Sequence, residues 1–206
     1  MKILVTGGSG YLGSILTRKL LAKNHNVRIL DNFLFGKESI KEIQNSKNLE
    51  IIDGDIRDLS IVSKAIKGVD AVIHLASIVG TQSAELDPKT SMEVNFMATR
   101  NIAELCKLYK IKQFIFASTC SVYGAQPDQL ISENSEVDPN LFANGASLTN
   151  IVPFLFSKVS PGFPITLLTN LFPVESYGKG GSNITISPFV GFNLNLLIKL
   201  LLIWVS

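Results

Sequence analysis

A glycine-rich turn near the N-terminus constrains this chain more than any other stretch. The apolar run Lys2–Val5 leads into residues 6–13, read as TGGSGYLG, and these open into the helix-forming stretch 14–21. Glycines recur at every third position, at Gly7, Gly10 and Gly13. The pattern predicts a short buried strand, a tight turn and the start of a helix.

Each of the three glycines has a physical role in a dinucleotide-binding turn. One allows the tight turn, one lets the backbone approach a pyrophosphate, and one lets the helix press on the strand. The free N–H groups at the start of the helix, around Tyr11 and Leu12, and the helix dipole both favour phosphate charges. A glycine turn that binds nothing is the competing interpretation.

An acidic residue at the end of the next strand supports the dinucleotide interpretation. The apolar run Asn26–Leu30 ends in Asp31, eighteen residues after Gly13. A Rossmann fold places there the carboxylate that accepts hydrogen bonds from the adenosine ribose. Asn32 and Phe33 follow, with no basic residue to neutralise a 2′-phosphate. The sequence therefore predicts NAD, rather than NADP, as the cofactor, with Asp31 at the ribose and Asn32 as a further cofactor-binding candidate.

Composition limits the other classes of function. The 206 residues carry a net charge of +2 with no basic cluster, which gives no reason to expect a nucleic-acid partner. Cys106 and Cys120 have no metal-ligand or C-x-x-C spacing, so we expect reduced thiols and no metal. The N-terminus lacks the pattern of a signal peptide, and the cytoplasm is the expected location.

Strand-like and helix-like stretches alternate through the first 140 residues. This order predicts an α/β fold with a doubly wound parallel sheet, the Rossmann NAD-binding fold. The expected strands are Lys2–Val5, Asn26–Leu30, Leu49–Asp53, a fourth strand that with its exit covers Val69–Ser77, and Gln113–Ala117. The expected helices after the first are Leu59–Lys67 and Pro88–Tyr109, the latter capped by Asp87.

Further candidate site residues follow the third and fourth strands. Asp55 and Ile56 are expected beside the adenine, where the Asp55 carboxylate can accept from the exocyclic amine, unless Asp55 simply caps a helix. Asp58 is interpreted as the cap of helix Leu59–Lys67. The residues Leu75, Ala76 and Ser77 leave the fourth strand, where small side chains let a cofactor lie close to the backbone. His74 is interpreted as a packed histidine rather than an acid or base.

The helix predicted at Pro88–Tyr109 has an apolar face. Met92, Phe96, Thr99, Ala103 and Cys106 fall at helical spacing and are expected in the core. Asn95, on the same stretch, is expected either to reach backbone near the site or to satisfy the interior.

Together these motifs resemble the extended short-chain dehydrogenase/reductase superfamily, in its nucleotide-sugar epimerase and dehydratase branch. The motifs are residues 6–13, Asp31, residues 54–58, His74–Ala76, Asn95 with Thr99, and residues 118–124. The resemblance covers about residues 1–140. It implies tightly held NAD, a nucleoside-diphosphate sugar as substrate, and pairing of subunits into a homodimer. In that family, NAD⁺ takes a hydride from a sugar carbon while an active-site base removes the hydroxyl proton.

The same resemblance implies three catalytic groups, of which one is present. The hydroxyl that bonds the reacting sugar corresponds to Thr119. The tyrosine base and its lysine, four residues later, correspond to Phe142 and Ala146. No Tyr-x-x-x-Lys occurs after Gly124. A chain with this sequence is therefore predicted to be inactive as an epimerase or dehydratase. The alternative is a non-catalytic NAD-binding module.

Composition changes after residue 140. Residues 141–206 form an apolar segment whose four charged side chains are Lys158, Glu175, Lys179 and Lys199. One interpretation is a shifted reading frame or truncated remainder of the fold, in which the stretch Phe163–Leu168 resembles a sixth strand. Another is a genuine non-catalytic protein. A membrane anchor at Leu194–Val205 is disfavoured, because about twelve residues are short of the ~20 that span a bilayer.

Overall fold

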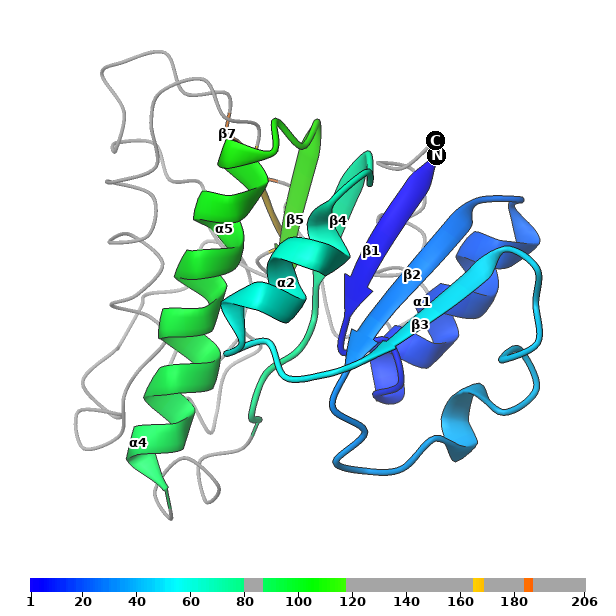
Figure 1. Cartoon of the computed structure of the whole chain (residues 1–206), viewed down its shortest axis with the longest axis horizontal. Helices are drawn as coiled ribbons and strands as arrows, with labels where there is room; N and C mark the ends of the chain where they lie inside the picture. The colour runs from blue at the N-terminus through cyan, green and yellow to red at the C-terminus, as the bar shows by residue number, and fades with distance from the viewer. Residues whose placement is uncertain (80–86, 118–164, 169–183, 187–206) are drawn as a thin grey trace, which may run out of the picture.

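The fold is a parallel sheet with helices on both faces, as the computed structural model shows (Figure 1). The structure describes residues 1–79, 87–117, 165–168 and 184–186. Five strands carry the described core: β1 (Lys2–Thr6), β2 (Asn26–Asp31), β3 (Leu49–Asp53), β4 (Ala71–His74) and β5 (Gln113–Ala117). They lie in the order β3-β2-β1-β4-β5, which confirms the predicted doubly wound α/β fold.

Two strands from the C-terminal segment extend the sheet beyond β5. β6 (Ile165–Leu168) pairs in parallel with β5, which confirms the strand predicted around Phe163–Leu168. β7 (Ile184–Ile186), which the sequence did not suggest, pairs in parallel with β6.

The alternation of side chains along the strands produces two apolar clusters, one on each face of the sheet. Helix α1 (Tyr11–Ala22) packs Leu16 and Leu20 against Ile3 and Val5 of β1 on one face. On the other face, Leu4 of β1 packs with residues of α2 (Leu59–Ile66) and α5 (Thr99–Leu108), which lie side by side in front of the sheet in Figure 1. Burial of apolar side chains on both faces holds the carboxyl edge of the sheet in place.

The predicted helix Pro88–Tyr109 is continuous but irregular. It begins as α4 (Pro88–Ser91), continues as a π-helical segment, η2 (Met92–Ala98), and ends as α5. Asp87 caps its start by accepting from the Thr90 N–H at 3.0 Å, as predicted. The wider π turn changes which side chains face the sheet. The placement of Met92 in the core is therefore wrong, since its side chain is exposed, and Phe96 is only half-buried.

The rest of that apolar face is as expected. Thr99, Ala103 and Cys106 are buried, and burial raises the pKa of the Cys106 thiol. Cys120 lies outside the described residues.

One buried charge shapes the fold in a way that the sequence did not indicate. Arg28 of β2 donates to the carbonyls of Ala65 at 2.6 Å and Lys67 at 2.9 Å, and pairs with Glu50 at 2.9 Å. It thus closes the C-terminal end of α2, where backbone carbonyls have no helical partner.

No helix within the described ranges is long and apolar enough to cross a membrane.

Candidate functional site

The glycine turn lies at the carboxyl ends of β1 and β4, where the strand order reverses. Gly7 has a φ of +70°, and its N–H donates to the Leu30 carbonyl of β2 at 2.9 Å. A Cβ at Gly7 would lie 2.8 Å from the Ala76 nitrogen, so the turn touches the backbone that leaves β4. Positive φ and this close approach both require glycine. Open α/β sheets bind ligands at such a switch point.

Two further glycines pack the turn onto the fold. A Cβ at Gly13 would lie 2.0 Å from the Gly7 carbonyl oxygen, which is why helix α1 can press on the turn. A Cβ at Gly8 would lie 2.6 Å from the Ile29 side chain of β2. The spacing of the other glycines did not predict the role of Gly8; its position between Gly7 and Gly10 was the available signal.

The start of α1 offers unpaired peptide N–H groups. The helix begins at Tyr11 with Gly10 as its N-cap, and no side chain caps it within the described part of the chain. Its first residues, Tyr11 and Leu12, are exposed and half-buried respectively. Uncapped N–H groups and the helix dipole together favour an anion at this point.

Asp31 joins the end of β2 to the glycine turn. Its Oδ2 accepts from the Ser9 N–H at 2.9 Å and its Oδ1 accepts from the Phe33 N–H at 2.9 Å. Asn32 is exposed, and its Oδ1 accepts from the Leu34 N–H at 3.1 Å. Each Asp31 oxygen has a second lone pair, so the carboxylate can still accept from a ligand.

Asp55 lies next to this group, after β3. The Gly54 N–H donates to the Asp31 carbonyl at 2.9 Å, which ties the two loops together. Arg57 pairs with Asp55, with 2.7 Å between Nη2 and Oδ2, and this hydrogen bond is the main reason that the pKa of Asp55 is lowered. Ile56 is buried in the core cluster between them.

Asp58, and not Asp55, caps helix α2. Its Oδ1 accepts from the N–H groups of Ser60 at 2.8 Å and Ile61 at 3.3 Å, as predicted for this residue. Helix α2 ends at Ile66, with Lys67 as its C-cap.

The exit of β4 is held by Asn95 of η2. The Asn95 Oδ1 accepts from the Ile78 N–H at 2.8 Å, and its Nδ2 donates to the Ile78 carbonyl at 2.9 Å. Of the two expected roles for Asn95, the structure shows contact with backbone beside the site. Leu75 and Ala76 are half-buried and Ser77 is exposed on the segment that Asn95 secures.

His74 is a packed histidine, as predicted. It is 1% exposed, stacks on Phe114 and Phe116, and contacts Thr6 Oγ1 at 2.6 Å and Thr99 Oγ1 at 2.8 Å. Burial lowers its pKa to about 4. It is therefore neutral near pH 7 and belongs to the support of the site.

The structure brings together most of the predicted cofactor residues at one edge of the sheet. Thr119, Phe142 and Ala146 lie outside the described residues. No group of three or more residues that could bind a metal occurs among the described residues.

Comparison with known proteins gives consistent results. Residues 3–142 match the family described as NAD dependent epimerase/dehydratase. The chain is 36% identical over 143 residues to D-erythronate dehydrogenase of Haemophilus influenzae, covering 68% of this chain and 44% of that protein. It is 29% identical over 187 residues to UDP-glucose 4-epimerase of Erwinia amylovora, covering 87% and 56%.

Solved structures are similar to most of the chain. UDP-glucose 4-epimerase of Bifidobacterium longum, in complex with NAD⁺ and UDP, gives a TM-score of 0.69 at 26% identity, covering 82% of this chain and 52% of that one. The dTDP-glucose 4,6-dehydratase DesIV of Streptomyces venezuelae, with NAD bound, gives 0.69 at 25% identity, covering 82% and 55%. The chain thus spans about half the length of these relatives.

Proposed function

Because this chain belongs to the NAD-dependent epimerase/dehydratase family, we propose that it binds NAD at the carboxyl edge of its sheet. The observation that carries the proposal is the glycine turn at the strand-order reversal, with the uncapped start of α1 on one side and Asp31 on the other. An uncapped helix start suits the pyrophosphate, and a carboxylate with remaining acceptor capacity suits the ribose.

We assign the rest of the cofactor along the same edge. Asp31 accepts hydrogen bonds from the hydroxyls of the adenosine ribose, with Asn32 beside it, and Asp55 and Ile56 contact the adenine. The other half of the dinucleotide lies along the segment Leu75–Ser77. Asn95 secures this segment through its two hydrogen bonds to Ile78. Three contacts between neighbouring loops support this arrangement. Gly7 packs against the backbone of Ala76, and the N–H groups of Ser9 and Gly54 both donate to Asp31.

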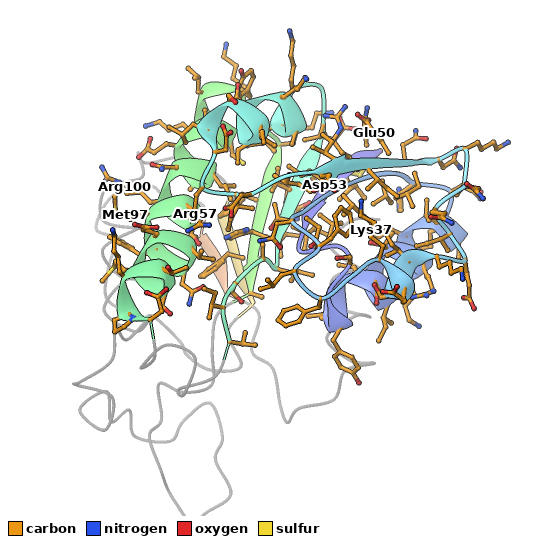
Figure 2. All side chains as sticks on the ribbon, turned by 60° about the horizontal axis from the view of Figure 1, so that its bottom comes forward. Lys37, Glu50, Asp53, Arg57, Met97 and Arg100 are labelled. Carbon is orange, nitrogen blue, oxygen red and sulfur yellow. The ribbon has the colours of Figure 1, made fainter. Side chains whose placement is uncertain are left out.

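We expect NAD(H) to bind at least about tenfold tighter than NADP(H), because a 2′-phosphate would face the Asp31 carboxylate. Lys37, on the loop after Asp31, has an ammonium that pairs with Asp53 at 2.9 Å; both residues are labelled in Figure 2. Calorimetric titration of the full chain with both nucleotides measures the ratio. Tighter binding of NADP(H) would refute the role given to Asp31.

A substitution in the loop separates cofactor binding from folding. Gly10→Val is expected to abolish NAD binding, because a branched side chain would occupy the space of the pyrophosphate. Among the described residues, the one close neighbour of a Cβ there is the Gly7 carbonyl at 3.2 Å, so the fold should survive. Full NAD affinity in a folded Gly10→Val protein would mean that the loop is only a turn.

We further propose that the family reaction on UDP- or TDP-hexoses, epimerisation or dehydration, does not proceed in this chain as written. Phe142 and Ala146 stand where the family has its tyrosine and lysine. Thr119 can bond a sugar hydroxyl but is too weak a base to remove its proton. Loss of general-base assistance costs about 10²- to 10⁴-fold in rate. The second candidate function, a non-catalytic NAD-binding module, rests on the same two substitutions.

No turnover is therefore expected when the chain is incubated with UDP- or TDP-hexoses and NAD, followed by NADH absorbance and by analysis of sugar epimers. Phe142→Tyr combined with Ala146→Lys should restore little, because Gly145 and the prolines that follow do not favour the helix needed to aim both groups. Turnover within tenfold of an active family member would require another base and contradict the proposal.

Partners and location follow from the same reasoning. We propose a nucleotide sugar as the ligand beside NAD, a homodimer formed through the long helices next to β5, and a cytoplasmic location. Relatives with bound NAD and UDP support the first of these. The net charge of +2 gives no support to a nucleic-acid partner.

A further inference from the structure

Arg57 makes an unusually complete set of contacts beside the proposed adenine position. Its backbone N–H donates to Asp55 Oδ1 at 2.8 Å, its Nε donates to the same oxygen at 3.0 Å, and its Nη2 donates to Oδ2 at 2.7 Å. Both carboxylate oxygens are therefore bound by one residue. A planar guanidinium that engages both oxygens fixes the plane of the carboxylate as well as its charge.

A second contact anchors the guanidinium from the opposite side. Arg57 Nη1 donates to Glu93 Oε2 of the π-helical segment at 3.3 Å, and Figure 2 shows Arg57 beside the helix that carries Met97 and Arg100. Ile56, between Asp55 and Arg57, is only 6% exposed and holds this loop in the core. The loop is thus anchored by buried Ile56, and the guanidinium of Arg57 is contacted by Asp55 and by Glu93, although the Arg57 side chain is 41% exposed.

A nucleobase would bind to whatever hydrogen-bond acceptor capacity of Asp55 is left by its protein partners. Two carboxylate oxygens accept about four hydrogen bonds, and Arg57 supplies three. Asn32 also hydrogen-bonds Asp55, but Asn32 is an exposed side chain that can be displaced. An ionised carboxylate only accepts, so the position that Asn32 can vacate suits a donor such as the adenine amine. It rejects the carbonyl oxygen that hypoxanthine has at the same position.

We propose that Arg57 is a positioning residue that makes the cofactor site selective for adenine. It keeps the Asp55 carboxylate ionised and in one orientation. Asp55 then recognises a dinucleotide by accepting a hydrogen bond from the exocyclic amine of its adenine. The inference rests on the proposed NAD function and adds to it the group that sets base selectivity. The lowered pKa of Asp55, for which the Arg57 hydrogen bond is the first cause, supports it.

The test compares NAD⁺ with nicotinamide hypoxanthine dinucleotide, which differs only at the base, by calorimetric titration of the full chain. The wild-type chain should prefer NAD⁺ at least about tenfold, since a hydrogen bond to a charged group is gained with one base and opposed with the other. Arg57→Met should reduce this preference to within about threefold. Arg57→Lys should do the same, because a lysine keeps the charge but cannot engage both oxygens.

Two further variants control for general damage to the site. Glu93→Gln removes the charge at the far end of Arg57 while leaving the three contacts to Asp55, and it should keep the wild-type preference. Asp55→Asn offers both a donor and an acceptor, so the preference should vanish or turn toward hypoxanthine. This last variant tests whether Asp55 reads the base, and it does so independently of whether the Arg57 variants fold.

The outcomes distinguish failure of NAD binding from failure of base selectivity. Failure of the wild-type chain to bind NAD⁺ would overturn the proposed function. Equal binding of both dinucleotides by a wild-type chain that binds NAD⁺ would overturn only the base selectivity. A full preference retained in Arg57→Lys would assign the effect to charge rather than to orientation, and a full preference in both Arg57 variants would remove Arg57 from base recognition altogether.

Discussion

Gly13→Ala is expected to destabilise this fold more than any other alanine substitution in the glycine turn. The new Cβ would lie 2.0 Å from the Gly7 oxygen and 2.8 Å from the Gly8 Cα, and neither backbone atom can rotate away. Helix α1 would have to lift from β1, which opens the cluster around Leu16 and Leu20. We expect a loss of about 3 kcal/mol or more in the free energy of unfolding, measured by urea denaturation.

Other glycines supply matched controls for this effect. Gly68 has a φ of +77°, and no atom of the described residues lies within 4 Å of an added Cβ, so Gly68→Ala isolates the backbone strain, about 1–2 kcal/mol. Gly7→Ala combines the same kind of strain with the close contact to Ala76. Gly10→Ala should cost about 1 kcal/mol as a poorer N-cap. A Gly13→Ala protein as stable as Gly68→Ala would mean that α1 can shift at little cost.

These glycines also show why some of the site could be predicted from the sequence. The spacing of Gly7, Gly10 and Gly13 and the position of Asp31 are local patterns, and the turn and the end of β2 follow them directly. The cap at Asp58 was predictable for the same reason, since its partners are two and three residues away. Patterns within short stretches of sequence therefore predicted these elements and placed the site at the carboxyl edge of the sheet.

What the sequence could not indicate depends on contacts between distant elements. Gly8 is constrained by Ile29, and Arg28 closes α2 across more than thirty residues. Met92 fits a regular helical stripe, but the π turn rotates it out to solvent. In each case the packing of another element decides the outcome, and periodicity within one segment carries no information about it.

The second large effect concerns the acid stability of the chain, through His74. Thr6 Oγ1 accepts from the N–H groups of Leu75 at 3.2 Å and Ala76 at 3.3 Å, so its own hydrogen points to His74 Nδ1. On the other side, Thr99 Oγ1 donates to the Asn95 carbonyl at 2.8 Å and so accepts from His74 Nε2. The network requires the neutral imidazole with its proton on Nε2.

Protonation of His74 therefore favours the unfolded chain. The pKa of His74 is about 4 in the folded protein, against an ordinary value of 6.5. Between these values the unfolded state binds more protons, so stability is full above about pH 6.5 and falls as the pH drops toward 4. The loss due to His74 should be about 2 kcal/mol between pH 7 and pH 5 and about 3 kcal/mol by pH 4. The range from pH 7 to pH 5 isolates the contribution of His74 best, because the carboxylates of lowered pKa, such as Asp55 and Asp70, stay ionised there.

Urea denaturation at pH 7, 6 and 5 tests this in three chains. His74→Gln can still accept from Thr6 and donate to Thr99 but does not titrate, so it should be less stable at pH 7 and lose most of the slope between pH 7 and pH 5; His25, whose pKa burial also lowers, supplies the rest. His25→Gln removes the other histidine, which is only half-buried at the end of α1, and should keep most of the slope. A slope that survives in His74→Gln and disappears in His25→Gln would place the acid sensitivity outside the network that joins β1, β4 and η2.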